Sequence, residues 1–193
     1  METIIGTEIV KINGTEVRLG HTWHEVDVIK GIIDIENPDF FFEIGVHEGA
    51  LSRELILYAK QKLTYVGIEL NCSIIHPIVQ PFYSLPRTIL ICGDCFSLDV
   101  IERIGNMLGK KIIYCDGGLK KEELKTYAPL LLVGDVLLSH DFSDGTRHGW
   151  GLPEEIRNEV SVEDIQFLED DPTFEHLSGH DFEGTRIIGY KKL

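Results

Sequence analysis

The sequence is short of basic residues, and this shortage excludes several classes of partner. Only 18 of its 193 residues are lysine or arginine, against 32 aspartates and glutamates, which gives a net charge of −14. Tight binding to nucleic acid or to an anionic membrane surface needs clustered cations, and only short pairs such as Lys120-Lys121 and Lys191-Lys192 are present. We therefore expect neither nucleic acid nor a membrane as a partner.

Long apolar runs and cysteines are also scarce. No apolar run reaches membrane-spanning length, and the first residues do not resemble a signal peptide. The cysteines are Cys72, Cys92, Cys95 and Cys115. So few cysteines, mostly in apolar patterns, are typical of a reduced, cytoplasmic protein. Cys92 and Cys95 have the spacing of a redox pair, but the intervening Asp94 would raise the pKa of a neighbouring thiol, so packing roles are favoured.

A linker rich in proline, glycine or serine is absent as well, so we expect a single domain over residues 1–193. Within it we distinguish an N-terminal extension (1–37), a core (38–142) and a segment with a loop and terminal strands (143–193). The oligomeric state cannot be predicted from these features.

Apolar runs alternate with helical patterns along the core. The predicted strands are residues 40–44, 64–69, 87–92, 111–115 and 133–140, and the predicted helices are residues 49–61, 73–80, 97–108 and 120–131. Continuous apolar strands that alternate with helices indicate an α/β doubly wound fold with a mostly parallel sheet.

The two ends of the chain depart from this alternation. A hairpin (9–12 and 16–19) turned at Asn13-Gly14 and a helix over 25–35 are predicted first. At the other end, residues 165–168 and 185–191 are predicted as an antiparallel pair of strands at the edge of the sheet.

Each of the five core strands ends at or beside an acidic residue. These residues are Glu43, Glu69, Asp94, Asp116 and Asp141. A single carboxylate at such a position can simply cap the next helix. Five carboxylates at the carboxyl edge of one sheet, where doubly wound folds bind ligands, favour a binding site. Gly45 and Gly49, in the turn after the first of these strands, would let a ligand approach the backbone.

These motifs resemble the class I S-adenosylmethionine-dependent methyltransferases, over residues 38–142. Glu43-Ile44-Gly45 followed by Gly49 is similar to the first motif of that family. The resemblance implies that Glu69 accepts hydrogen bonds from the ribose hydroxyls of the cofactor and that Asp94 lies near its adenine. The other cofactor-binding residues that it implies are Glu43, Gly45, His47, Gly49 and Asp116.

A nicotinamide dinucleotide fold is the alternative that the first motif and Glu69 leave open. Its fingerprint requires a second glycine that admits a pyrophosphate, and Val46-His47 stands at that place. Glu48 would also repel a pyrophosphate, so a sulfonium cofactor is favoured.

A closer resemblance is to the cephalosporin hydroxylase-like and macrocin-type O-methyltransferases. It is carried by Asp116-Gly117-Gly118-Leu119 and by Ser139-His140-Asp141. The chain departs from that branch at Leu119, where a histidine is usual, so the catalytic base cannot be inherited from it. The groups available for catalysis are then Asp116, His140 and Asp141, which favours methylation of a hydroxyl on a small molecule or a sugar.

In several of these relatives acidic residues at the fourth and fifth strands hold a divalent cation. Asp116 and Asp141, with His140 or Asp144 nearby, match those positions, and such a set suits Mg²⁺ or another divalent cation such as Mn²⁺. Alternatively, Asp116 caps its helix or contacts the cofactor while His140 and Asp141 order a loop. The different class of function left open is a cofactor-binding domain without methyltransferase activity.

Overall fold

The N-terminal part of the chain folds as a hairpin followed by a helix. The computed structural model describes residues 8–59, 62–143, 160–177, 182 and 185–193. β1 (Ile9–Ile12) pairs antiparallel with β2 (Thr15–Arg18), as the sequence predicts. Helix α1 (Trp23–Glu36) begins at a capping box in which the Thr22 and Glu25 side chains each accept the other residue's backbone N–H.

The described residues contain one large sheet of seven strands, in the order β5-β4-β3-β6-β7-β9-β8. Its strands are β3 (Phe40–Ile44), β4 (Thr64–Glu69), β5 (Thr88–Cys92), β6 (Lys111–Cys115), β7 (Val136–Ser139), β8 (Phe174–His176) and β9 (Ile188–Lys192). The five core strands are parallel, and β9 runs antiparallel to both β7 and β8. This is the doubly wound, mostly parallel sheet with an antiparallel C-terminal pair that the sequence predicts.

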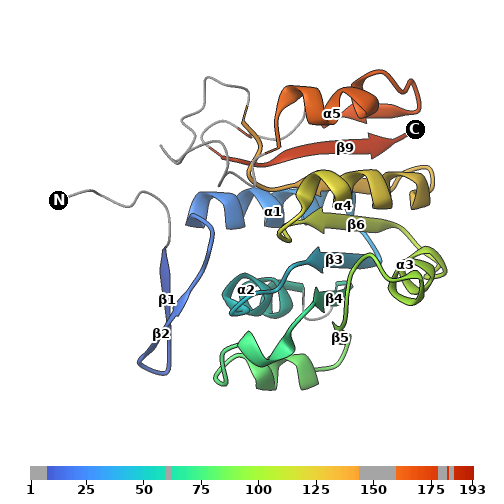
Figure 1. Cartoon of the computed structure of the whole chain (residues 1–193). Coiled ribbons are helices and arrows are strands. Elements are labelled where there is room, and N and C mark those ends of the chain that lie inside the picture. The colour runs from blue at the N-terminus through green and yellow to red at the C-terminus, as the bar shows by residue number, and fades with distance from the viewer. Residues whose placement is uncertain (1–7, 60–61, 144–159, 178–181, 183–184) are drawn as a thin grey trace.

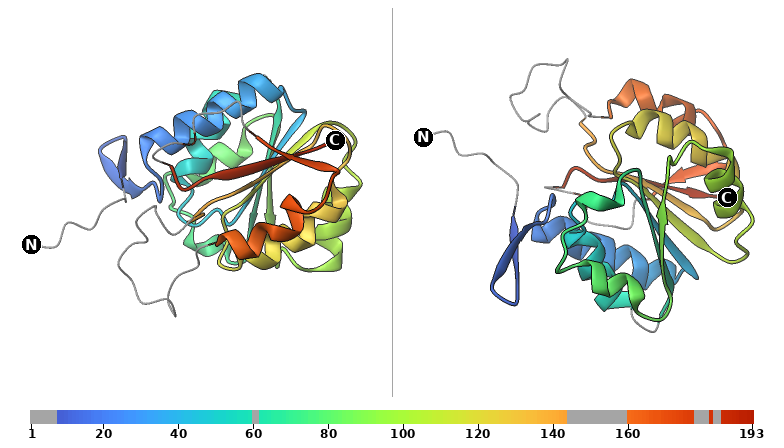
Figure 2. Two further views of the ribbon diagram at one scale, coloured as in Figure 1. Left: turned by 90° about the horizontal axis from the view of Figure 1, so that it is seen from above. Right: turned by 60° about the horizontal axis from the view of Figure 1, so that its bottom comes forward.

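Helices cover both faces of the sheet, and strand residues alternate between two hydrophobic clusters (Figures 1 and 2). Phe41 packs on the face of α1 and α2 (Ala50–Ala59), whereas Phe42 packs on the opposite face. The helices of that opposite face are α3 (Leu98–Gly105), α4 (Lys120–Tyr127) and α5 (Val162–Glu169). Burial on both faces explains the continuous apolar strands. None of the described helices is both long and apolar enough to cross a membrane.

The predictions of two secondary-structure elements are wrong. Residues 73–80 do not form an α-helix. Two short 3-10 helices lie in this region, Cys72–Ile74 and Gln80–Ser84. Pro77 and Pro81 have no backbone N–H to donate to the hydrogen bonds of an α-helix. Residues 165–168 belong to α5 and not to a strand. A capping box between Ser161 and Asp164 starts this helix, and tertiary packing buries Ile165 and Leu168 on its inner face. β8 takes the position beside β9 instead.

The expectation of four reduced thiols is also wrong, because Cys72 and Cys92 form a disulfide. The parallel register of β4 and β5 sets Cys92 beside Glu69, and Cys72 follows Glu69 by three residues. The two sulfur atoms therefore meet at the carboxyl ends of these strands. Cys95 and Cys115 are free.

Candidate functional site

The candidate site lies where the connections of the sheet reverse direction, at the carboxyl ends of β3 and β6. β3 is hydrogen-bonded to β4 on one side and to β6 on the other. In doubly wound sheets ligands bind at this point. A cavity of about 870 Å³ lies along this edge, which is within the roughly 300–1,000 Å³ of small-molecule pockets. In Figure 1 the arrowheads of β3 and β6 point toward the side where the β1–β2 hairpin lies.

The turn between β3 and α2 depends on glycine. Gly45 has φ +87°, and a Cβ added there would lie 2.6 Å from the Cα of Gly117. Gly49 has φ +84°, and its added Cβ would meet Val79 at 2.9 Å. His47 has a positive φ of 53°, at the position where related turns carry a second glycine. The two glycines let the turn pack against the neighbouring loop while the cavity stays open beside it.

Glu69 organises this turn from the end of β4. Its Oε2 accepts the backbone N–H groups of Val46 at 3.1 Å and His47 at 3.0 Å, and its Oε1 accepts that of Asn71 at 2.9 Å. Asp94, which is exposed at the end of β5, accepts the backbone N–H of Phe96 at 2.9 Å. Both carboxylates line the cavity, as predicted from the sequence. Their contacts with a ribose and an adenine stay predictions.

Glu43 lies deeper, behind the turn. Its carboxyl group is 1% exposed and accepts hydrogen bonds from Ser52 Oγ at 3.1 Å and Tyr65 Oη at 2.5 Å. Burial raises the pKa of Glu43 to about 8, against the two hydrogen bonds that lower it. Glu43 therefore supports the turn as a largely protonated acid at neutral pH.

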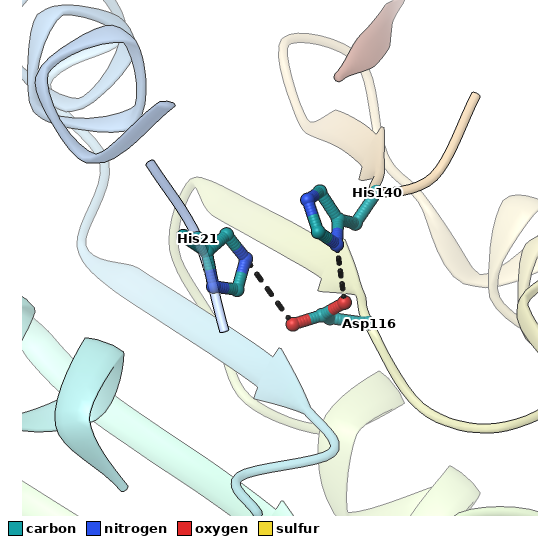
Figure 3. A group of neighbouring side chains, drawn as sticks. All are labelled: His21, Asp116 and His140. Atoms are coloured by element: carbon teal, nitrogen blue, oxygen red, sulfur yellow. Dashed lines mark hydrogen bonds and ion pairs between the residues drawn. The ribbon is translucent and has the colours of Figure 1, made fainter. Parts of the chain in front are cut away.

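The half of the cavity away from β4 and β5 contains three clustered side chains from three parts of the chain. We call His21, Asp116 and His140 the His–Asp–His cluster (Figure 3). His140 Nδ1 lies 2.9 Å from Asp116 Oδ1, and His21 Nε2 lies 3.3 Å from Asp116 Oδ2. The two imidazole rings stack with their centroids 4.2 Å apart. Tyr114 Oη also lies 2.8 Å from His21 Nε2.

A partly buried network of ion pairs surrounds this cluster. Glu25 Oε1 lies 3.4 Å from His140 Nε2 and accepts the Nε–H of Arg186 at 3.1 Å. Arg186 Nη1 lies 2.8 Å from Asp141 Oδ1, and Lys120 Nζ lies 3.0 Å from Asp141 Oδ2. Lys120 also donates to the carbonyl of Gly117 at 2.8 Å. Both oxygens of Asp141 are thus engaged by cations of this chain.

These contacts shift the pKa values in the cluster. Burial alone would lower the pKa of His140, but the charge and hydrogen bond of Asp116 outweigh it and raise this pKa to about 9. Burial alone would raise the pKa of Asp116, and the two histidines hold it well below its usual range. Glu25 likewise has a lowered pKa, because His140 and Arg186 more than offset its burial.

The sequence missed the partners that reach this edge through tertiary packing. Glu25 comes from α1 and Arg186 from the segment before β9, and neither residue has a local signal for a site. Lys120 could have been found, because it follows Asp116 by four residues. The predicted residues Asp116, His140 and Asp141 do meet at this edge, whereas Asp144 lies outside the described residues.

The donor atoms decide which metal ion the site could hold. The predicted pair of Asp116 and Asp141 is a poor match for Mg²⁺ in this arrangement, because Arg186 and Lys120 already neutralise Asp141. The His–Asp–His cluster does offer a ligand set, since one ligand atom from each residue lies within 4.8 Å of the other two. Two imidazoles and one carboxylate are a known combination for divalent transition metals.

Comparison with known proteins shows the fold. No protein-family model and no curated protein matches the sequence. CmcI, in a structure with Mg and SAM, superposes with a TM-score of 0.70 at 16% identity, over 95% of this chain and 76% of CmcI. An O-methyltransferase from Bacillus cereus in complex with SAH gives a TM-score of 0.62 at 15% identity, over 89% of this chain and 82% of that one. TomG from Streptomyces achromogenes is an O-methyltransferase involved in tomaymycin synthesis, in complex with SAM. It gives a TM-score of 0.62 at 12% identity, over 89% of this chain and 80% of TomG.

The chain therefore has the fold of the S-adenosylmethionine-dependent O-methyltransferases. The antiparallel β9 between β7 and β8 completes that topology. At these identities the likeness concerns the fold, and the function has to be argued from the site.

Proposed function

We propose that this protein binds S-adenosylmethionine and methylates a hydroxyl group of a small molecule or a sugar. One observation carries the proposal: a single cavity joins the glycine turn, Glu69 and Asp94 to the buried pair of Asp116 and His140. The first set suits a nucleoside cofactor, and the second suits a reacting hydroxyl at the far end of the same cavity. The structural neighbours that contain SAM or SAH support this assignment.

The charge of the cavity favours a sulfonium cofactor over a phosphorylated one. Glu48, Glu69 and Asp94 line its β3–β4–β5 half. Carboxylates repel a pyrophosphate and attract the sulfonium and ammonium groups of S-adenosylmethionine. We infer that Glu69 accepts the ribose hydroxyls, that Asp94 lies near the adenine, and that Gly45 and the backbone of His47 border the methionine part.

Methyl transfer needs an acceptor positioned in line with the sulfonium, and a hydroxyl acceptor must also lose a proton. When bound, the cofactor supplies the electrophilic methyl group. His140 in its neutral form is the group able to receive the proton, and because its pKa is raised to about 9 this form becomes more populated as the pH rises. Asp116, 2.9 Å from His140 Nδ1, stabilises the imidazolium that forms. Arg186 and Lys120 hold both oxygens of Asp141. Asp141 Oδ1 also lies 3.4 Å from His140 Nδ1, so Asp141 helps to orient that imidazole.

Radiolabelled methyl transfer to a panel of sugars, phenols and nucleosides, with and without divalent cations, tests the proposal. We expect turnover on a hydroxyl acceptor, and His140→Gln should lower kcat by about 10²–10⁴-fold, which is the usual contribution of an acid–base group. The binding of S-adenosylhomocysteine should change little. His24→Gln is the matched control, because His24 is exposed on α1 and does not line the cavity.

The result that contradicts enzymatic activity is firm binding of S-adenosylhomocysteine with no methylation of any acceptor class, with or without metal. The protein would then be a cofactor-binding domain without methyltransferase activity. The absence of a histidine at Leu119 keeps this alternative worth testing.

A further inference from the structure

The two histidines of the His–Asp–His cluster each direct one ring nitrogen toward the same carboxylate. These atoms are His140 Nδ1 and His21 Nε2, which approach different oxygens of Asp116 at 2.9 and 3.3 Å. Both rings are buried, and Figure 3 shows them facing Asp116 from two separate segments of the chain. Two ring nitrogens and one carboxylate thus converge on one small region beside the cavity.

The other nitrogen of each ring faces a hydrogen-bond acceptor. His21 Nδ1 lies 3.2 Å from the carbonyl oxygen of Leu19, and His140 Nε2 lies 3.4 Å from the carboxylate of Glu25. A carbonyl and a carboxylate can only accept, so these outer nitrogens carry the protons when the rings are neutral. The inner nitrogens are then the ones that can bind an ion. The ion would displace the proton between His140 Nδ1 and Asp116. It would also replace Tyr114 Oη, which lies 2.8 Å from His21 Nε2. Metal-binding histidines are held in the same way, with the distal N–H donated to a carbonyl or a carboxylate.

We propose that His21, Asp116 and His140 bind one divalent transition metal ion, of the Fe²⁺–Zn²⁺ series, and that this site is not built for Mg²⁺. Two imidazoles and one carboxylate favour such ions, whereas Mg²⁺ prefers oxygen ligands. Asp141 is excluded from the ligand set, because Arg186 and Lys120 contact its two oxygens. His21 takes its place, from the segment between the hairpin and α1.

Three protein ligands leave at least one coordination position free, as in catalytic metal sites. All three residues line the cavity, so this position is accessible to a small molecule there. The binding of the ion is independent of the proposed function, and only its use for an acceptor hydroxyl rests on that function. With the ion bound, His140 would be a ligand and not the base, and the ion would lower the pKa of the hydroxyl in its place. The site would also tie the N-terminal extension to the sheet.

Titration of the chelator-treated full-length protein with Co²⁺, followed by visible d–d absorption, tests the site. We expect one Co²⁺ per chain in a site of low coordination number, displaced by Zn²⁺ and unaffected by a large excess of Mg²⁺. His21→Ala should weaken Co²⁺ binding by at least about 100-fold, because loss of an outer-shell partner alone costs about 10–100-fold. His24→Ala is the matched control, with an exposed histidine three residues away, and should bind like the wild type.

Circular dichroism should establish that each variant is folded. Histidine side-chain 15N resonances give a second readout in the wild type, since Zn²⁺ should shift His21 Nε2 and His140 Nδ1. An unchanged Co²⁺ affinity in folded His21→Ala, or the absence of a Co²⁺ spectrum in the folded wild type, would overturn the proposal. So would Mg²⁺ binding that requires Asp141. Calorimetry with S-adenosylhomocysteine on the metal-free protein reports separately on the proposed function.

Discussion

Glu43 shows that an acidic residue in a ligand-binding motif can serve mainly as a structural support. Its carboxyl group is fully enclosed by the sheet and α2 and receives hydrogen bonds from Ser52 and Tyr65. Burial raises its pKa to about 8, and the negative charges of Asp116 and Glu69 act in the same direction. Its ionisation therefore costs folding free energy, and this cost depends on pH.

We expect the free energy of unfolding to fall as the pH rises from about 4.5 to about 8, the ordinary and the folded-state pKa of Glu43. In this window the folded protein keeps a proton that the unfolded chain has lost, so stability decreases by up to about 1.4 kcal/mol per pH unit from this group. Glu43→Gln should flatten that part of the profile and raise the stability near its upper end. Urea unfolding at a series of pH values across this window measures the free energy of unfolding, with the exposed Glu102→Gln as control. Identical pH profiles for Glu43→Gln and the wild type would contradict the account.

At the scale of elements, the disulfide joins the carboxyl ends of β4 and β5, beside Glu69. Cys72 and Cys92 are 20 residues apart in sequence, and a crosslink over a loop of that length stabilises a fold by about 3 kcal/mol in the chain-entropy treatment. It holds the segment after β4 against the sheet edge that borders the cavity. The region that it encloses contains the two short 3-10 helices and no α-helix among its described residues.

Peptide mapping without a reducing agent should recover Cys72 linked to Cys92, with only Cys95 and Cys115 available for alkylation after unfolding. Cys72→Ser should lower the free energy of unfolding by about 3 kcal/mol, whereas in Cys95→Ser the crosslink should persist. Four alkylated thiols, together with a stability that reductant does not change, would show that the crosslink does not form.

The elements also show how far the sequence can be interpreted. The strands at residues 40–44, 64–69 and 111–115 could be predicted to their ends, because burial on both faces makes each a continuous apolar run. Residues 165–168 could not be assigned in this way, since a four-residue apolar pattern suits either a strand or a helix. In the structure the capping box at Ser161 starts a helix there. The strand-end acids Asp116 and Asp141 were predictable for the same topological reason as the strands.

On the scale of the whole molecule, the two ends of the chain complete the site that the core begins. His21 and Glu25 from the N-terminal part and Arg186 from the C-terminal part meet at the carboxyl edge of the central strands. These residues are far from Asp116 in the sequence, so no local pattern predicts that they belong to the site. The cavity therefore combines a β3–β4–β5 half, which was predictable from motifs, with a half in which tertiary packing adds residues from both ends of the chain to the predictable strand-end residues.

The most direct test of the account is calorimetric titration of the full-length protein with S-adenosylhomocysteine. We expect binding of one molecule per chain. Glu69→Ala should weaken it by about 10–100-fold or more, in line with the loss of hydrogen bonds to a charged group, while the exposed Glu102→Ala should leave it unchanged. Saturable binding of NAD in its place, or no binding of S-adenosylhomocysteine by the folded wild type, would contradict the central claim.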